Sequence, residues 1–150
     1  MKHVNVGDLT IANDQPLTVI AGPCQLESLD HAQMIAGKMK EACDAAGAQY
    51  VFKASYDKAN RTSVSGKRGL GIDEGLTVLG AVKDAIGVPV LTDIHTEEPC
   101  AHVARALDIM QHPACRCRQT DLLVAPGRTA PETHNQHSKE PAPQGRDPRT

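Results

Sequence analysis

The chain has 150 residues, a formal net charge of −2 and an isoelectric point of about 6.4. This length suits one ordinary domain but falls short of the roughly 250 residues of a closed eight-stranded α/β barrel. Cations are local rather than spread over a face, so a nucleic-acid partner is not expected. No run of about 18 apolar residues and no signal-peptide pattern is present, which excludes a membrane partner and makes the cytoplasm the default location. The five cysteines lack framework spacing, so free thiols are expected.

The first 50 residues predict a hairpin, a strand and a helix. Residues 3–12 alternate polar and apolar around Gly7 and Asp8, which is typical of a small hairpin. Residues 17–21 form a β-branched run closed by Gly22, and Ser28 can cap a helix over residues 29–46. The apolar residues that we expect on the inner face of this helix are Met34, Ile35, Met39 and Ala42.

Strands and helices then alternate in the remainder of the ordered part. We expect strands over residues 50–53, 88–92 and 114–117. We expect helices over residues 73–86 and 97–110, the first with Leu76, Leu79 and Val82 facing inward and Gly87 ending it. This cadence predicts an α/β fold with a parallel sheet, in which four strands and three helices make the first half of a (β/α)8 barrel behind an N-terminal hairpin.

The composition changes near residue 125. Five of the ten prolines lie in the last 25 residues, where the only apolar side chains besides proline are Ala130 and Ala142. Such a segment buries too little surface to offset its ordering entropy, so disorder is expected. The sequence therefore predicts a folded domain over residues 1–124 and a tail over 125–150, which we interpret as a frame-shifted or otherwise foreign ending.

A cationic stretch directly follows the expected strand at residues 50–53. Residues 53–63 read Lys-Ala-Ser-Tyr-Asp-Lys-Ala-Asn-Arg-Thr-Ser, with three permanent cations among neutral donors. Arginine binds phosphate or carboxylate in a planar fork, and lysine offers a compact movable charge. A solvated basic loop would have a similar composition, but the position just past a buried strand is where α/β proteins place their sites.

The same stretch closely resembles the signature of the 3-deoxy-D-manno-octulosonate 8-phosphate synthase family. The discriminating tetrapeptide is Lys-Ala-Asn-Arg at residues 58–61, and the Ala-Gly-Pro-Cys turn at residues 21–24 is shared with a sister family. The resemblance runs from about Leu9 to Val124. It implies a (β/α)8 transferase of lipopolysaccharide biosynthesis, which condenses phosphoenolpyruvate with arabinose 5-phosphate and is typically a homotetramer.

The resemblance also implies roles for individual residues. Lys53 and Lys58 match contacts to phosphoenolpyruvate, and Lys58 also matches one to the reacting aldehyde. Gln119 matches a further phosphoenolpyruvate contact. The residues that match the arabinose 5-phosphate site are Asn60, Arg61 and Thr62, the last two on the phosphate.

Asp93 is a second catalytic candidate beside Lys58. It ends an expected strand, at the position where barrel enzymes keep functional groups. The alternative is a cap for the following helix. His95, two residues later, is expected to be a hydrogen-bonded neighbour rather than a ligand.

Cys24 decides the class of enzyme within the resembled family. Cysteine at this position implies the class that depends on a divalent metal such as Mn, Zn or Fe, with Cys24 as one ligand. A catalytic metal needs about three protein ligands and an open position. The family's histidine, glutamate and aspartate ligands have no match in this chain.

Two other functions remain open at this point. One is the sister synthase, which would use erythrose 4-phosphate in place of arabinose 5-phosphate. The other is a non-catalytic fragment, since half of the barrel strands and most metal ligands are missing and an open parallel sheet would expose unpaired edges. We therefore expect little turnover from the 150-residue chain alone.

Overall fold

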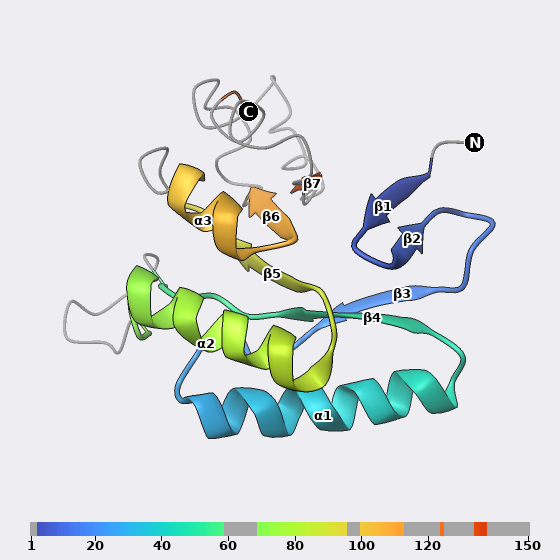
Figure 1. Ribbon diagram of the computed structural model, residues 1–150, viewed down its shortest axis with the longest axis horizontal. Coiled ribbons are helices and arrows are strands. Elements are labelled where there is room, and N and C mark those ends of the chain that lie inside the picture. The colour runs from blue at the N-terminus through green and yellow to red at the C-terminus, as the bar shows by residue number, and fades with distance from the viewer. Residues whose placement is uncertain (1–2, 59–68, 96–99, 113–123, 125–133, 138–150) are drawn as a thin grey trace, which may run out of the picture.

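A computed structural model describes residues 3–58, 69–95, 100–112, 124 and 134–137. Helices α1 and α2 lie side by side along a twisted sheet, and a separate hairpin lies near the N-terminus (Figure 1). The helices are α1 (Leu29–Ala45), α2 (Ile72–Ile86) and α3 (Cys100–Ala106). The strands are β1 (Val4–Val6), β2 (Leu9–Ile11), β3 (Thr18–Ala21), β4 (Gln49–Lys53), β5 (Val90–Asp93), β6 (Ile109–His112) and β7 (His134–His137).

The larger sheet is parallel throughout, in the order β3-β4-β5-β6-β7. Parallel neighbours need a crossover connection, and α1, α2 and α3 supply those between the first four strands. This confirms the predicted α/β class with a parallel sheet. Among the described residues, no helix is both long and apolar enough to cross a membrane.

The predicted N-terminal hairpin is confirmed. Strands β1 and β2 pair antiparallel, with Val6 opposite Leu9, and Gly7 adopts a positive φ of 55° in the turn between them. Glycine pays no steric penalty for this left-handed conformation. The hairpin packs on the sheet through Val6, Leu9 and Ile11, which join a cluster with Ile20, Val51, Leu91 and Ile109.

The two faces of the sheet have different partners because side chains alternate along each strand. One face packs against α1, α2 and α3 in the larger core cluster, which includes Phe52, Val90 and Met110. The other face, here called the inner face, carries Ile20, Val51, Leu91 and Ile109 under the hairpin. The hairpin therefore covers the apolar part of the inner face, and it also reaches the amino end of β4, where Gln49 Nε2 donates to the Thr10 carbonyl at 3.0 Å.

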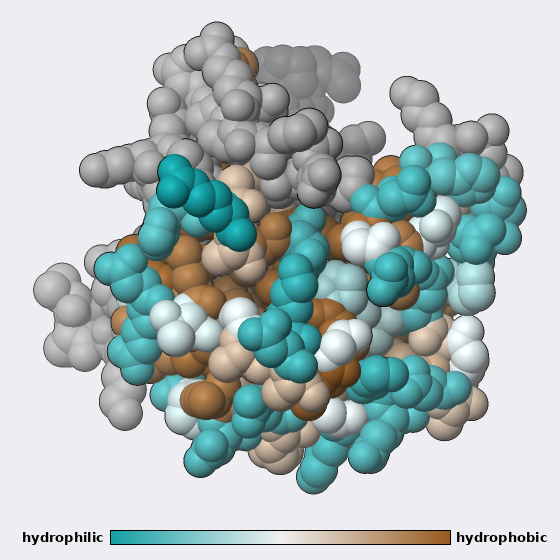
Figure 2. Space-filling view, viewed as in Figure 1, coloured by the Kyte–Doolittle hydropathy of each residue, from teal (hydrophilic) through white to brown (hydrophobic). Residues whose placement is uncertain are grey.

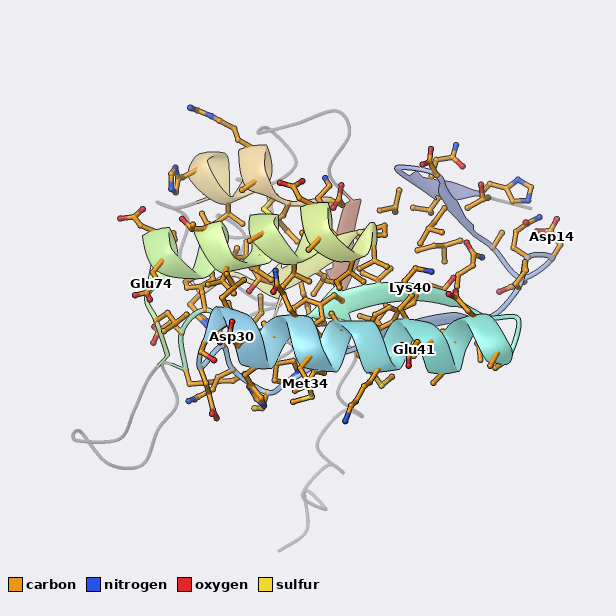
Figure 3. All side chains as sticks on the ribbon, turned by 60° about the horizontal axis from the view of Figure 1, so that its bottom comes forward. Asp14, Asp30, Met34, Lys40, Glu41 and Glu74 are labelled. Carbon is orange, nitrogen blue, oxygen red and sulfur yellow. The ribbon has the colours of Figure 1, made fainter. Side chains whose placement is uncertain are left out.

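Helix α1 begins at the predicted cap, where the backbone N–H of His31 donates to Ser28 Oγ at 3.2 Å. The expected inner face of this helix is wrong for Met34, which is 47% exposed and points away from α2 (Figure 3), and for Ala42, which is also exposed. The face that packs is made by Ala32, Ile35, Ala36, Met39 and Cys43. Small Ala32 and Ala36 let the helix backbone approach its neighbours, which turns Met34 outward.

Helix α2 follows the prediction. Leu76, Leu79 and Val82 are buried, and Gly87 ends the helix with a φ of 71°. In Figure 2, brown apolar residues gather where α2 and α3 lie, between teal polar residues. The buried Val103 and Leu107 of the α3 segment join the core that α2 also enters.

The fourth parallel strand, β6, begins earlier in the chain than the sequence predicts. The expected helix over 97–110 ends at Ala106, and Ile109–His112 forms β6 in register with β5. Residues 114–117, where the strand was expected, lie outside the described residues. Hydrogen bonds fix the earlier start, because the Asp108 carboxylate accepts from the backbone N–H of Val90 at 3.0 Å and from Lys83 Nζ at 2.7 Å.

Of the expected tail over residues 125–150, the structure describes only residues 134–137. They form β7, which pairs with β6. The rest of residues 125–150 lies outside the described part, so their disorder stays a prediction.

Candidate functional site at the carboxyl edge of the sheet

The carboxyl ends of the parallel strands bring the candidate residues to one edge. Strand β3 ends at Ala21 shortly before Cys24, β4 ends at Lys53, and β5 ends at Asp93. In open and closed parallel sheets, ligands bind outside this edge. The cavities of about 870 Å³ beside residues 11–18 and about 330 Å³ beside Gly87 and Asp8 lie elsewhere, next to the hairpin and the starts of the strands.

Alternation along the strands gives this edge a polar layer on the inner face. Lys53 follows Val51 by two residues, Asp93 follows Leu91, and Gln111 follows Ile109. Each polar residue therefore shares the face of the buried apolar residue before it. The inner face thus changes from apolar under the hairpin to a lysine, an aspartate and a glutamine at the carboxyl edge.

Register keeps this polar layer together. Asp93 is the partner of Gln111, and Lys53 is the partner of Leu91, one layer below Asp93. The backbone also joins the strand ends, because Ile94 N–H donates to the Gln111 carbonyl at 3.0 Å and Ala54 N–H donates to the Leu91 carbonyl at 3.2 Å. These side chains consequently start from fixed backbone positions.

Ser55 joins the two predicted catalytic residues. Its hydroxyl donates to Asp93 Oδ1 in a short hydrogen bond and accepts from Lys58 Nζ at 2.7 Å. Ser55 is fully buried and Asp93 is 8% exposed, whereas Lys58 is half-buried. The arrangement holds an ammonium group beside a buried carboxylate through one hydroxyl.

The backbone around Ser55 is also fixed. Its carbonyl accepts from Leu26 N–H at 2.9 Å, and Gln25 and Ser55 form an isolated parallel bridge. The segment after β3 and the segment after β4 therefore continue side by side beyond the strands. This pairing brings the stretch that contains Cys24 next to the stretch that contains Ser55.

His95 lies beside the same group. Its Nε2 is 3.0 Å from the Asp57 carbonyl oxygen and 3.5 Å from Asp93 Oδ2, and its ring centroid is 6.2 Å from that of Tyr56. A carbonyl can only accept, so Nε2 carries the hydrogen in this arrangement. His95 thus ties the end of β5 to the loop after β4, as a hydrogen-bonded neighbour would.

Two glycines let the edge assemble. A Cβ at Gly22 would overlap the Lys53 carbonyl oxygen, and a Cβ at Gly75 would overlap Cβ of Tyr56. Glycine at these positions therefore permits close approach of the β3 loop to β4 and of α2 to the β4 loop. The loop from Ser55 to Lys58 is held against α2 by this contact.

Several predicted site residues cannot be placed. Asn60, Arg61, Thr62 and Gln119 lie outside the described residues, so their roles stay predictions. Lys53, Lys58 and Asp93 share the carboxyl edge, with Lys58 and Asp93 joined by Ser55. Lys53 is half-buried, and its side chain makes no hydrogen bond or ion pair with the other described residues.

Cys24 is exposed, with a free thiol in the turn after β3. Within the part of the chain that the structure describes, no group of three or more His, Cys, Asp or Glu side chains could hold a metal ion. One thiol is a single ligand, so the described donor set does not by itself fit a catalytic metal.

Sequence reasoning missed two residues of this edge. The sequence places Gln111 just after a predicted helix. In the structure it lies near the carboxyl end of β6, beside Asp93 of β5. Ser55 was read as part of the cationic stretch without a role of its own. Its signal is its place two residues past Lys53, where a buried parallel strand emerges from the sheet.

Comparisons with known proteins give the family of the chain. Over residues 2–131 the sequence matches the DAHP synthetase I family, and the chain belongs to that family. Relatives from Brucella ovis and Brucella abortus are 54% identical over 126 residues, and one from a Chelativorans species is 53% identical over 127 residues. All three are named 2-dehydro-3-deoxyphosphooctonate aldolase.

The matched segments cover 84% of this chain for the Brucella relatives and 85% for the Chelativorans relative, but 46% of each relative's own length. The chain thus spans about half the length of the curated relatives it matches. Their name confirms the predicted resemblance to the octulosonate 8-phosphate synthases, a resemblance first seen in the Lys53–Ser63 stretch.

Proposed function

We propose that the carboxyl edge of this sheet binds phosphoenolpyruvate and belongs to a transferase that condenses it with D-arabinose 5-phosphate. The products are 3-deoxy-D-manno-octulosonate 8-phosphate and inorganic phosphate. The observation that carries this proposal is the Lys58 ammonium held through Ser55 beside Asp93, with Lys53 at the same edge. The name of the 54% identical relatives supports the same reaction.

The proposed condensation requires cations at fixed positions. Phosphoenolpyruvate and arabinose 5-phosphate are both polyanions, and they must meet without repelling one another. Ammonium groups at set positions offset that repulsion and convert a two-body encounter into an oriented one. Lys53 and Lys58 are suited to the carboxylate or phosphate of phosphoenolpyruvate, and Gln111 to a neutral hydrogen bond beside Asp93.

The proposed reaction forms one carbon–carbon bond and releases phosphate. Carbon 3 of phosphoenolpyruvate forms a bond to the aldehyde carbon of arabinose 5-phosphate, and the aldehyde oxygen takes up a proton. Water adds at carbon 2, and its oxygen becomes the ketone oxygen as the bond from carbon 2 to the phosphate oxygen breaks. One of the two protons of the water balances the proton taken up by the aldehyde oxygen, and the other leaves with the released phosphate. In this proposal Lys58 donates a proton to the aldehyde oxygen, and Asp93 holds the ammonium through Ser55.

The finer architecture belongs to the same proposal. The inner face with its apolar layer, its polar layer and its hairpin cover is what the first half of a (β/α)8 barrel would present. In that setting the first four parallel strands would continue into four more. Asn60, Arg61 and Thr62 would bind arabinose 5-phosphate, and Gln119 would add a contact to phosphoenolpyruvate.

A divalent metal with Cys24 as one ligand is part of the proposal. The exposed thiol next to the Gln25–Ser55 bridge supports it, since the thiol lies at the same edge as Lys58. The test is titration with Co²⁺, whose charge-transfer absorption reports a bound thiolate. A band that is lost in Cys24→Ser and kept in Cys43→Ser supports the assignment, and a band unaffected by Cys24→Ser contradicts it.

Phosphate release tests the function. The purified chain and the Brucella ovis relative are assayed with phosphoenolpyruvate and either arabinose 5-phosphate or erythrose 4-phosphate, with Mn²⁺ or Zn²⁺ added. We expect release by the relative with arabinose 5-phosphate, and binding of phosphoenolpyruvate with little release by the 150-residue chain. Preference for erythrose 4-phosphate in either protein would favour the sister synthase.

A further inference from the structure

We infer that Ser55 is a positioning residue, which holds the Lys58 ammonium at the carboxyl edge by coupling it to Asp93. The identity of the ligand that Lys58 meets rests on the function proposed above. The coupling itself does not, because it follows from the contacts among three side chains.

The direction of the hydrogen bonds makes the coupling specific. A carboxylate only accepts and an ammonium only donates, so Ser55 must give its one hydrogen to Asp93 and accept from Lys58. The charge on Asp93 thereby orients the hydroxyl so that its lone pairs face Lys58. Without that charge, the hydroxyl is free to turn its hydrogen elsewhere.

Burial makes the coupling strong. Ser55 is fully buried and Asp93 nearly so, and a hydrogen bond that involves a charged group is stronger in such surroundings than in water. Two further groups lie near these side chains. His95 Nε2 lies 3.5 Å from Asp93 Oδ2, and Lys53, two residues before Ser55, belongs to the inner face of β4.

Thr92 offers a matched control. Its hydroxyl is as buried as that of Ser55 and is also hydrogen-bonded between β4 and β5, but its acceptor is a backbone carbonyl and not a charged side chain. Removal of either hydroxyl therefore leaves a comparable buried defect. Only the loss of Ser55 removes the acceptor of Lys58.

The test measures how fast Lys58 reacts with limiting acetic anhydride, by mass spectrometry, relative to exposed Lys38 of α1 in the same sample. Acetylation needs an amine that is clear of its hydrogen bonds. We expect Ser55→Ala and Asp93→Asn each to raise the relative rate about threefold to tenfold, in line with one hydrogen bond of a half-buried charged group. Thr92→Val should leave the ratio unchanged.

The double variant separates coupling from independent effects. Ser55→Ala with Asp93→Asn should react no faster than the quicker single variant, because both changes break the same connection. Additive effects, or a Ser55→Ala rate equal to that of Thr92→Val, would overturn the inference. If circular dichroism shows that Ser55→Ala does not fold, Ser55→Cys takes its place, since a thiol is a weak partner of similar shape, and a rate equal to wild type then overturns the inference.

The same experiment keeps the two proposals apart. Phosphoenolpyruvate added to the wild-type chain should slow acetylation of Lys58 and not of Lys38. Absence of protection contradicts the proposed ligand, whereas the acetylation rates of the ligand-free variants decide the role of Ser55 alone.

Discussion

Asp93 and Gln111 are register partners at the carboxyl ends of β5 and β6, and each lies two residues beyond a buried residue of the inner face. The polar layer of the site is therefore a direct continuation of the apolar layer that the hairpin covers. Leu91 and Ile109 belong to the core, whereas Asp93 and Gln111 lie at the edge where binding is proposed.

This relationship predicts a role for Gln111 in binding. Gln111→Leu removes a neutral donor and acceptor from the edge and leaves the half-buried volume nearly unchanged. We expect phosphoenolpyruvate to bind about threefold to tenfold more weakly, which corresponds to one hydrogen bond. Calorimetric titration measures the change, and Gln15→Leu, an exposed loop position, is the control. Equal affinities for wild type and Gln111→Leu would exclude Gln111 from the site.

The contact between Gly75 and Tyr56 predicts opposite effects for two alanine substitutions on α2. A Cβ at Gly75 would overlap Tyr56, while a Cβ at Gly80 has no neighbour within 4 Å. Gly75→Ala should lower the free energy of unfolding by about 1–3 kcal/mol. Gly80→Ala should raise it by about 0.5–1 kcal/mol, since alanine is the better helix former.

Urea denaturation compares these two variants with the wild-type chain. Gly75→Ala should also weaken phosphoenolpyruvate binding, because Tyr56 lies between Ser55 and Lys58 in the loop that α2 supports. Stabilisation of both variants by the same amount would show that α2 does not hold this loop.

Tyr50 predicts a loss of stability at high pH. Burial, with a smaller contribution from the charge of Cys43, raises the pKa of Tyr50 from 10.0 to about 12. The folded state therefore favours the neutral phenol, whose hydroxyl donates to the Ala21 carbonyl at 3.1 Å. The resulting stabilisation is complete below the unfolded pKa of about 10 and is lost as pH rises toward 12.

Tyr50→Phe isolates this effect from the titration of other groups. At neutral pH the variant should lose about 1 kcal/mol, because the Ala21 carbonyl loses its side-chain donor. Between pH 10 and 12 the wild-type chain should lose more stability than the variant, so the difference between them narrows. A constant difference over this range, measured by urea unfolding, would contradict the pKa assigned to Tyr50.

The regular alternation of strands and helices could be predicted from sequence, but the start of β6 could not. Val103, Ala106, Leu107 and Met110 fit helical spacing, so the pattern favours a helix through residue 110. Pairing of Ile109 and Met110 with β5 and the hydrogen bonds of Asp108 override that spacing. Met34 is a similar case, since sequence spacing gives several helix faces and only packing selects one.

The site was predictable where its chemistry is carried by charge. Lys53 and Asp93 could be named because each is an ionised residue at the end of an apolar run, and Lys58 because it belongs to the cationic stretch that resembles the family signature. Ser55 and Gln111 could not, because a serine or glutamine has many uses and only register and burial give these two a place in the site. The network through Ser55 depends on contacts between residues 38 positions apart, which no local pattern records.

If the cations of the carboxyl edge bind phosphoenolpyruvate as proposed, calorimetric titration of the 150-residue chain will show saturable binding. Lys58→Met and Lys53→Met should each weaken this binding by about tenfold or more, as expected for charge-assisted hydrogen bonds, while Lys38→Met on the outer side of α1 should leave it unchanged. Absence of binding by the wild-type chain, or the same affinity in Lys58→Met as in wild type, would contradict the proposal.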